Sequence, residues 1–292
     1  MKPGRDRPPA RGGARHAKRN ADRKKAYWRL GMAVAVVLAV GAIAVIVRPT
    51  PVNALTGCPK AQTAPDAHTV ILIDETDRLA RNELRFVRDL VMTEYMWLPI
   101  GGRLTVRNIL SDPAEGDDIT VCRIASNSST GGLLDNERNI RKRFEKIAGA
   151  RMAALFEGLA AAPEQDASPL MESIAVTLQR SDFDANTEAR RLVVVSDFAQ
   201  HSDLYSMYGR QGLPPLSDEA EEELHRDMAG VDVRLQYVRR RDLAGLQGKA
   251  HRGFWSDYFE PQEPKSFALG HGLLIGEATD RETYLYETSD SR

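Results

Sequence analysis

The chain has 292 residues, of which 42% are hydrophobic and 28% are charged, and its formal net charge is -1. These values are ordinary for a globular protein and exclude a chain too polar to build a packed core. The near-neutral average hides an asymmetry. Residues 1–47 contain 11 Lys or Arg residues and two acids, whereas the rest of the chain contains 29 basic and 39 acidic residues.

The N-terminal region has the pattern of a membrane anchor. Residues 30–47 form a run of 18 residues without a charge, preceded by Tyr27 and Trp28. Such a run is about the minimum that crosses a bilayer core, and aromatic residues favour its interface. Because positive charge stays on the cytoplasmic side, we expect a basic disordered tail over 1–29 and a transmembrane helix over 30–48. A C-terminal domain in the periplasm of a bacterial inner membrane then follows.

Two other interpretations of this region were weighed. A cleaved signal peptide has a shorter apolar run, of roughly 7–15 residues, and a short basic lead. Residues 55–58 (LTGC) resemble a lipobox, but two prolines, Pro49 and Pro51, separate them from the apolar run. The basic tail is interpreted as a topology signal, and no nucleic-acid partner is expected.

Cys58 and Cys122 are the only cysteines, and both lie beyond the predicted span. An even number of cysteines in an oxidising compartment predicts a disulfide between them. Two unpaired structural cysteines are the alternative.

The chain after the span alternates between strand and helix patterns. Residues 49–67 are rich in proline and are predicted to be a linker to a domain over 68–292. Apolar runs and alternating segments predict strands over 68–74, 103–110, 118–124, 191–197 and 231–238. Apolar residues at helical spacing predict helices over 79–97, 135–161, 217–229 and 252–259, and a further helix with Ser168 as N-cap and Pro169 at its first position.

This order of elements predicts an α/β domain with a mostly parallel sheet. Two acids, Asp74 and Asp197, directly end the two most apolar strands. In parallel sheets ligands collect at the carboxyl ends of the strands, so a site is expected there.

The order also resembles that of a von Willebrand factor A-like (vWA) domain, over about residues 66–290. The resemblance implies a Rossmann-like three-layer sandwich. In that family a metal-ion-dependent adhesion site begins with Asp-x-Ser-x-Ser after the first strand. A Thr from a later loop and an Asp after the fourth strand complete it, and the site binds a divalent cation that a partner's acidic group can share.

Matched to this pattern, the metal ligands are Asp74, Thr76, Ser168 and Asp197, and the cation is Mg²⁺. The departure is Arg78, which stands where the second Ser is expected. Its positive charge beside the site favours a degenerate, metal-free site, and an occupied one is the alternative.

The sequence also contains one segment that resembles a catalytic motif. Residues 70–79 look like a Walker B strand, but that chemistry needs a Gly-rich phosphate loop upstream, and the only Gly-Lys pair, Gly248-Lys249, lies downstream. The remaining enzymatic alternative is a metal-dependent hydrolase that uses Asp74 and Asp197.

The stretch after Asp197 is long and carries His201, Tyr205 and Tyr208. Long loops on rigid scaffolds often carry function, and exposed tyrosines anchor interfaces, so these three residues are predicted to bind a partner protein. A loop packed on its own aromatic residues is the alternative. The sequence therefore predicts a membrane-anchored vWA-like protein-binding module, not an enzyme, within a bacterial envelope complex.

Overall fold

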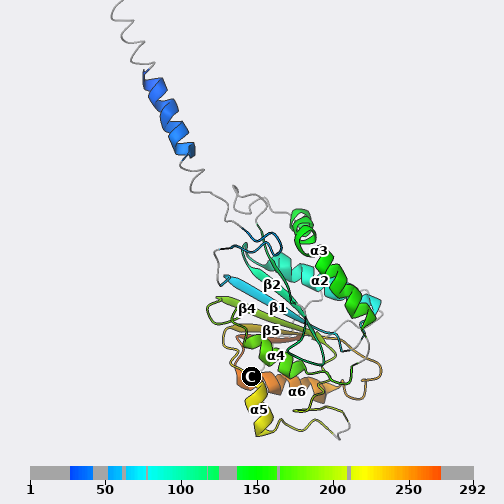
Figure 1. Cartoon of the computed structure of the whole chain (residues 1–292). Helices are drawn as coiled ribbons and strands as arrows, with labels where there is room; N and C mark the ends of the chain where they lie inside the picture. The colour runs from blue at the N-terminus through cyan, green and yellow to red at the C-terminus, as the bar shows by residue number, and fades with distance from the viewer. Residues whose placement is uncertain are drawn as a thin grey trace, which may run out of the picture. The chain divides into compact units, whose positions relative to one another are not determined.

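The computed structural model describes residues 27–41, 52–60, 64–76, 78–116, 118–124, 137–162, 165–208 and 212–270 (Figure 1). The chain divides into two compact units, Met1–Pro49 and Thr50–Arg292. In the first unit a helix covers 27–41 with its side chains exposed. No helix within the described ranges is both long and apolar enough to cross a membrane. Residues 42–48 of the predicted span lie outside those ranges.

The second unit is built on one six-stranded sheet in the order β3-β2-β1-β4-β5-β6. Its strands are β1 (Ala67–Asp74), β2 (Arg103–Ile109), β3 (Asp118–Cys122), β4 (Ala189–Ser196), β5 (Val231–Tyr237) and β6 (Ser266–Gly270). Every neighbouring pair is parallel except β2 and β3, which form the predicted antiparallel hairpin. The prediction of a mostly parallel α/β sheet is confirmed.

Helices cover both faces of this sheet. They are α2 (Arg81–Trp97), α3 (Glu137–Ala161), α4 (Leu170–Leu178), α5 (Asp218–Leu224) and α6 (Lys249–Phe259). One core joins α2 and α3 to alternate residues of β1 and β4, among them Ile71 and Val193. The other core joins α4, α5 and α6 to the intervening residues, among them Val70 and Leu192. A strand buried on both faces needs a continuous apolar run, which is why β1 and β4 gave the clearest sequence signals.

Two elements differ from the sequence predictions. The acidic helix over 217–229 is shorter, because α5 ends at Leu224 and the chain continues extended from His225. The edge strand β6 was not predicted. It has five residues, none of them fully buried, so it lacks the apolar signal of the central strands.

The chain enters the domain at the amino edge of the sheet. The predicted disulfide between Cys58 and Cys122 is present. The Cys122 backbone N–H also donates to the Thr56 carbonyl, at 2.8 Å. Cys122 pairs with Arg103, the first residue of β2, so this junction lies where the parallel strands begin. Asp74 lies at the opposite end of β1, about 23 Å away at roughly 3.3 Å per residue.

Candidate functional site

Asp74 is the centre of a buried polar cluster at the carboxyl edge of the sheet. It is only 5% exposed. Its Oδ1 accepts hydrogen bonds from the Thr76 backbone N–H at 3.0 Å and from the Thr76 hydroxyl at 2.6 Å. Its Oδ2 accepts from the hydroxyls of Ser196 at 2.7 Å and Ser168 at 3.4 Å. Asp74 thereby joins the ends of β1 and β4 to the segment before α4.

The end of β4 is a turn held by its own side chains. Ser196 Oγ accepts from the Phe198 backbone N–H at 2.8 Å, and Asp197 Oδ1 accepts from the Ala199 backbone N–H at 2.9 Å. Short polar side chains commonly hold turns in this way. The turn directs the Asp197 side chain toward the same edge of the sheet as Asp74, and Asp197 is only 4% exposed.

Phe198 completes the turn in a left-handed backbone conformation, with φ of 63°. For a bulky residue this conformation costs about 1–3 kcal/mol and persists only when its surroundings enforce it. Contacts with helix α6 and strand β5 hold Phe198 in this conformation. The Phe198 carbonyl accepts hydrogen bonds from Trp255 Nε1 at 3.0 Å and His251 Nε2 at 2.9 Å, both on α6. The Phe198 ring stacks on that of Tyr237, on β5.

Ser168 has a different role from the predicted one. The N-cap of α4 is Pro169, which has no side chain able to accept a hydrogen bond, and the helix begins at Leu170. Ser168 instead directs its hydroxyl to Asp74, and its backbone pairs with His201. The buried side chain of Gln200 caps the start of α4, because its Oε1 accepts a hydrogen bond from the Met171 backbone N–H at 3.0 Å.

Arg240, which follows β5, brings a cation to this edge of the sheet. Its Nε lies 3.6 Å from Asp197 Oδ2, and its Nη1 donates to Glu83 Oε2 at 3.4 Å and to the Arg78 carbonyl at 3.1 Å. Arg78, the residue expected to oppose a metal, is exposed and contributes this carbonyl. The position of Arg240 could have been inferred from its place after a parallel strand, since such strand ends converge.

The arrangement fits a metal ion poorly. Two carboxylates and three hydroxyls are oxygen donors of the kind that Mg²⁺ prefers. The three hydroxyls, however, all lie within hydrogen-bonding distance of Asp74, and Asp197 is paired with a guanidinium. Across the described ranges, no three His, Cys, Asp or Glu side chains are grouped so as to hold a metal ion.

The loop after the turn separates the three predicted partner-binding residues. Tyr205 is 4% exposed; its hydroxyl donates to the Pro214 carbonyl at 2.6 Å and its ring stacks on Phe254. It therefore supports the loop from inside. Tyr208 is 46% exposed and its ring meets that of half-buried His201 edge to face. Leu204, not singled out from the sequence, is 38% exposed.

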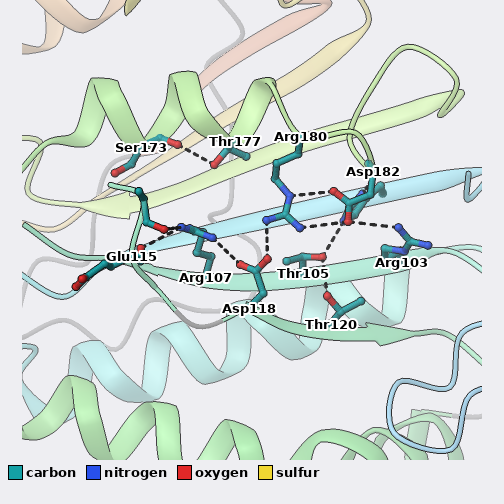
Figure 2. Close-up of polar contacts among 12 residues, drawn as sticks. Arg103, Thr105, Arg107, Glu115, Asp118, Thr120, Ser173, Thr177, Arg180 and Asp182 are labelled. Carbon is teal, nitrogen blue, oxygen red and sulfur yellow. Dashed lines mark hydrogen bonds and ion pairs between the residues drawn. The ribbon is translucent and has the colours of Figure 1, made fainter. Parts of the chain in front are cut away.

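A second polar network lies on the α4 side of β2 and β3 (Figure 2). Two acids link three arginines in a chain whose order is Arg103, Asp182, Arg180, Asp118 and Arg107. Burial alone raises the pKa of Asp182, but its hydrogen bonds and charge contacts with Arg180 outweigh this and lower it. Arg107 also donates to three carbonyls of the hairpin loop, those of residues 113–115. The network therefore fastens the hairpin to the turn that follows α4.

No protein-family model matches the sequence, and no curated protein is significantly similar to it. Among solved structures, the chain is similar to an aerotolerance-related membrane protein from Bacteroides fragilis NCTC 9343 that carries multiple mutations to serine. The identity is 10% and the TM-score 0.33, and the match covers 72% of this chain and 92% of that one.

The chain is also similar to the human COPII-coat protein Sec24c, with 12% identity, a TM-score of 0.33, and coverage of 65% of this chain and 28% of that one. A third similar structure is the TFIIH p34 N-terminal domain, with 8% identity, a TM-score of 0.26, and coverage of 68% and 98%. Likenesses of this size say nothing of what the chain binds.

Proposed function

We propose that this chain is a membrane-anchored, vWA-like protein-binding module that works in an envelope complex of a bacterial inner membrane. The observation that supports this most directly is the placement of two features at opposite edges of one sheet. The chain enters beside Cys58 at the amino edge, and the polar cluster around Asp74 lies at the carboxyl edge. A domain that is held at the amino edge of its sheet exposes the carboxyl edge to a partner.

The polar cluster acts in this proposal as a metal-free lock. The Asp74 carboxylate replaces a bound cation as the centre that holds Thr76, Ser168 and Ser196 together. Arg240 supplies the positive charge beside Asp197. Because the base of the loop is already rigid, the loop loses less conformational entropy when it binds a partner.

The proposed contact surface is the outer side of the loop after β4. Leu204 and Tyr208 are its exposed apolar and aromatic side chains. Backbone pairing of His201 with both Ser168 and Ser206 holds the loop that carries them. A fixed, partly exposed tyrosine is a common anchor of protein interfaces.

The test is photocrosslinking in cells, with p-benzoylphenylalanine introduced at Tyr208 of the full chain. The matched control is Trp97, which is 78% exposed and lies near the amino edge, before the start of β2. We expect an adduct with a second protein from position 208 and none from position 97. Absence of an adduct at both Leu204 and Tyr208 would contradict the assigned surface.

The hydrolase alternative makes a different prediction. It needs a bound divalent cation, so calorimetric titration of the full chain with Mg²⁺ or Mn²⁺ should show binding that Asp197→Ala removes. A metal-free lock shows no such binding at millimolar cation.

A further inference from the structure

The first half of α3 carries an exposed basic face that few contacts among the described residues engage. Residues 137–147 include five cationic residues and two acids, although the chain beyond residue 47 is acidic overall. Four of the five cations are exposed: Arg138, Arg141, Lys142 and Lys146. Arg141 forms an ion pair with Glu137, one turn earlier, which is itself exposed.

One of these charges lies at an unfavourable place on the helix. The partial positive charge of a helix N-terminus disfavours cations within the first turn, where Arg138 lies beside Glu137. All four cations lie within about two and a half turns of α3, so together they present a positively charged surface that suits an anionic neighbour.

Contacts of α3 place this basic face past the amino edge of the sheet. Arg151 donates to the carbonyl of Thr120, within β3, at 3.4 Å. Two helical turns earlier, Arg143 donates to the carbonyl of Ile124, beyond the end of β3, at 3.1 Å. Because β3 ends at the amino edge, the residues before Arg143 project beyond that edge, as one end of α3 does in Figure 1.

The chain enters the domain beside the same helix. Arg151 also donates to the Leu55 carbonyl at 2.8 Å. Gly57 lies so close to Ile147 that a Cβ built on it would be 3.1 Å from the Ile147 side chain. From residue 48, the end of the predicted span, to residue 52 there are four residues, which reach at most about 14 Å when fully extended.

We propose that the face formed by Arg138, Arg141, Lys142 and Lys146 binds anionic phospholipid headgroups of the membrane that anchors the chain. This inference rests on the membrane anchor of the proposed function. The contact holds the amino edge of the domain against the bilayer surface and so directs the carboxyl edge outward. Exposed Lys and Arg side chains close to a membrane surface are attracted to anionic lipid headgroups.

The experiment uses the full chain in lipid nanodiscs, made either of phosphatidylcholine alone or of phosphatidylcholine mixed with phosphatidylglycerol. Hydrogen–deuterium exchange is followed at the amides of residues 137–147. We expect exchange about tenfold slower with the anionic lipid, an effect that added salt weakens because it screens exposed charges. The triple variant Arg138→Glu, Arg141→Glu, Lys142→Glu should lose the difference. It should fold, since acids suit this end of a helix.

The matched control is Arg239→Glu, Arg241→Glu, Lys249→Glu, which reverses three exposed charges beyond β5, at the other edge of the sheet. This variant should keep the lipid effect. Equal exchange of the wild-type chain in the two lipids overturns the headgroup contact alone, and so does a control variant that also loses the effect. A chain that does not co-elute with nanodiscs contradicts the anchor itself, and the contact with it.

Discussion

Arg240 stands beside Asp197 at the carboxyl edge of the sheet, with its Nε 3.6 Å from Oδ2. Both side chains are largely buried, at 17% and 5% exposure. The same guanidinium reaches Glu83 on α2. A residue of the chain therefore supplies a positive charge to two acids at this edge.

Substitution of Arg240 tests this arrangement. Arg240→Gln leaves Asp197 and Glu83 buried without their cation, and we expect it to lower the free energy of unfolding by about 3 kcal/mol. Urea denaturation measures the change. We also expect Mg²⁺ to stabilise the variant and not the wild-type chain. The exposed neighbour Arg241→Gln is the control, and an equal loss in both variants would speak against the pairing.

Removal of the charge at Asp74 should loosen the lock. In Asp74→Asn one carboxylate oxygen becomes an amide NH₂, which cannot accept from the hydroxyls of Thr76 or Ser196. We expect a loss of about 2–3 kcal/mol, because buried donors are left unpaired. The control is Asp166→Asn, at an exposed position, with both variants compared by urea denaturation. A loss below that of the control would show that the hydroxyls find other partners.

Two buried histidines predict loss of stability in mild acid. Burial lowers the pKa of His68 and of His251 to about 4, from 6.5. The unfolded chain therefore takes up these protons more readily, and stability falls as the pH drops from about 6.5 toward 4. Above pH 6.5 the two groups contribute no slope.

The check is the free energy of unfolding at pH 7.5 and pH 5, which should differ by roughly 1–2 kcal/mol for each histidine. His251→Gln should remove about half of the difference, since glutamine does not titrate. An unchanged pH dependence in that variant would show that His251 is not the group responsible.

The disulfide should contribute substantially to stability. Cys58 and Cys122 are 64 residues apart, and closing a loop of that length limits the unfolded chain by about 4 kcal/mol in the chain-entropy model. The double variant Cys58→Ala, Cys122→Ala should therefore melt at a lower temperature than the oxidised chain. Reducing agent should bring the wild-type melting temperature to that of the variant and leave the variant unchanged.

The strand and helix order was readable from the sequence because the main elements bury continuous or regularly spaced apolar residues. The strands that end at Asp74 and Ser196 lie under helices on both faces, so their β-branched runs were clear. β6 escaped detection because an edge strand of partly exposed residues needs no such run. The short α5 was overestimated because the acidic pattern continues past His225, where the backbone becomes extended.

The site was readable only in part. Asp74, Thr76, Ser168 and Ser196 come together at one edge of the sheet, and the first three were predicted from the resemblance to a vWA metal-site motif. Arg240 was missed because no motif marks it, and its place after the parallel strand β5 was the signal that could have brought it to this edge. Local spacing pointed to Arg78 instead, whose side chain is exposed.

The exposure of side chains in the loop after β4 was also only partly predictable from the sequence. Three polar or aromatic residues, His201, Tyr205 and Tyr208, looked equivalent in the sequence. Tyr205 packs on Phe254 of α6, about 50 residues later, and so belongs to the interior. Exposure within a loop depends on what the loop packs against, which its own sequence does not contain.

The disulfide also determines how the domain responds to a pulling force. The disulfide gives tension from the N-terminal segment a covalent path through Cys58 into the end of β3, in addition to the chain that leads to β1. A partner that pulls on the loop after β4 acts at the opposite edge of the sheet. The two forces run along the strands in opposite directions, so the hydrogen bonds between β3, β2, β1 and β4 resist together in shear. A tether closed in this way suits a domain that must stay folded while its partner moves.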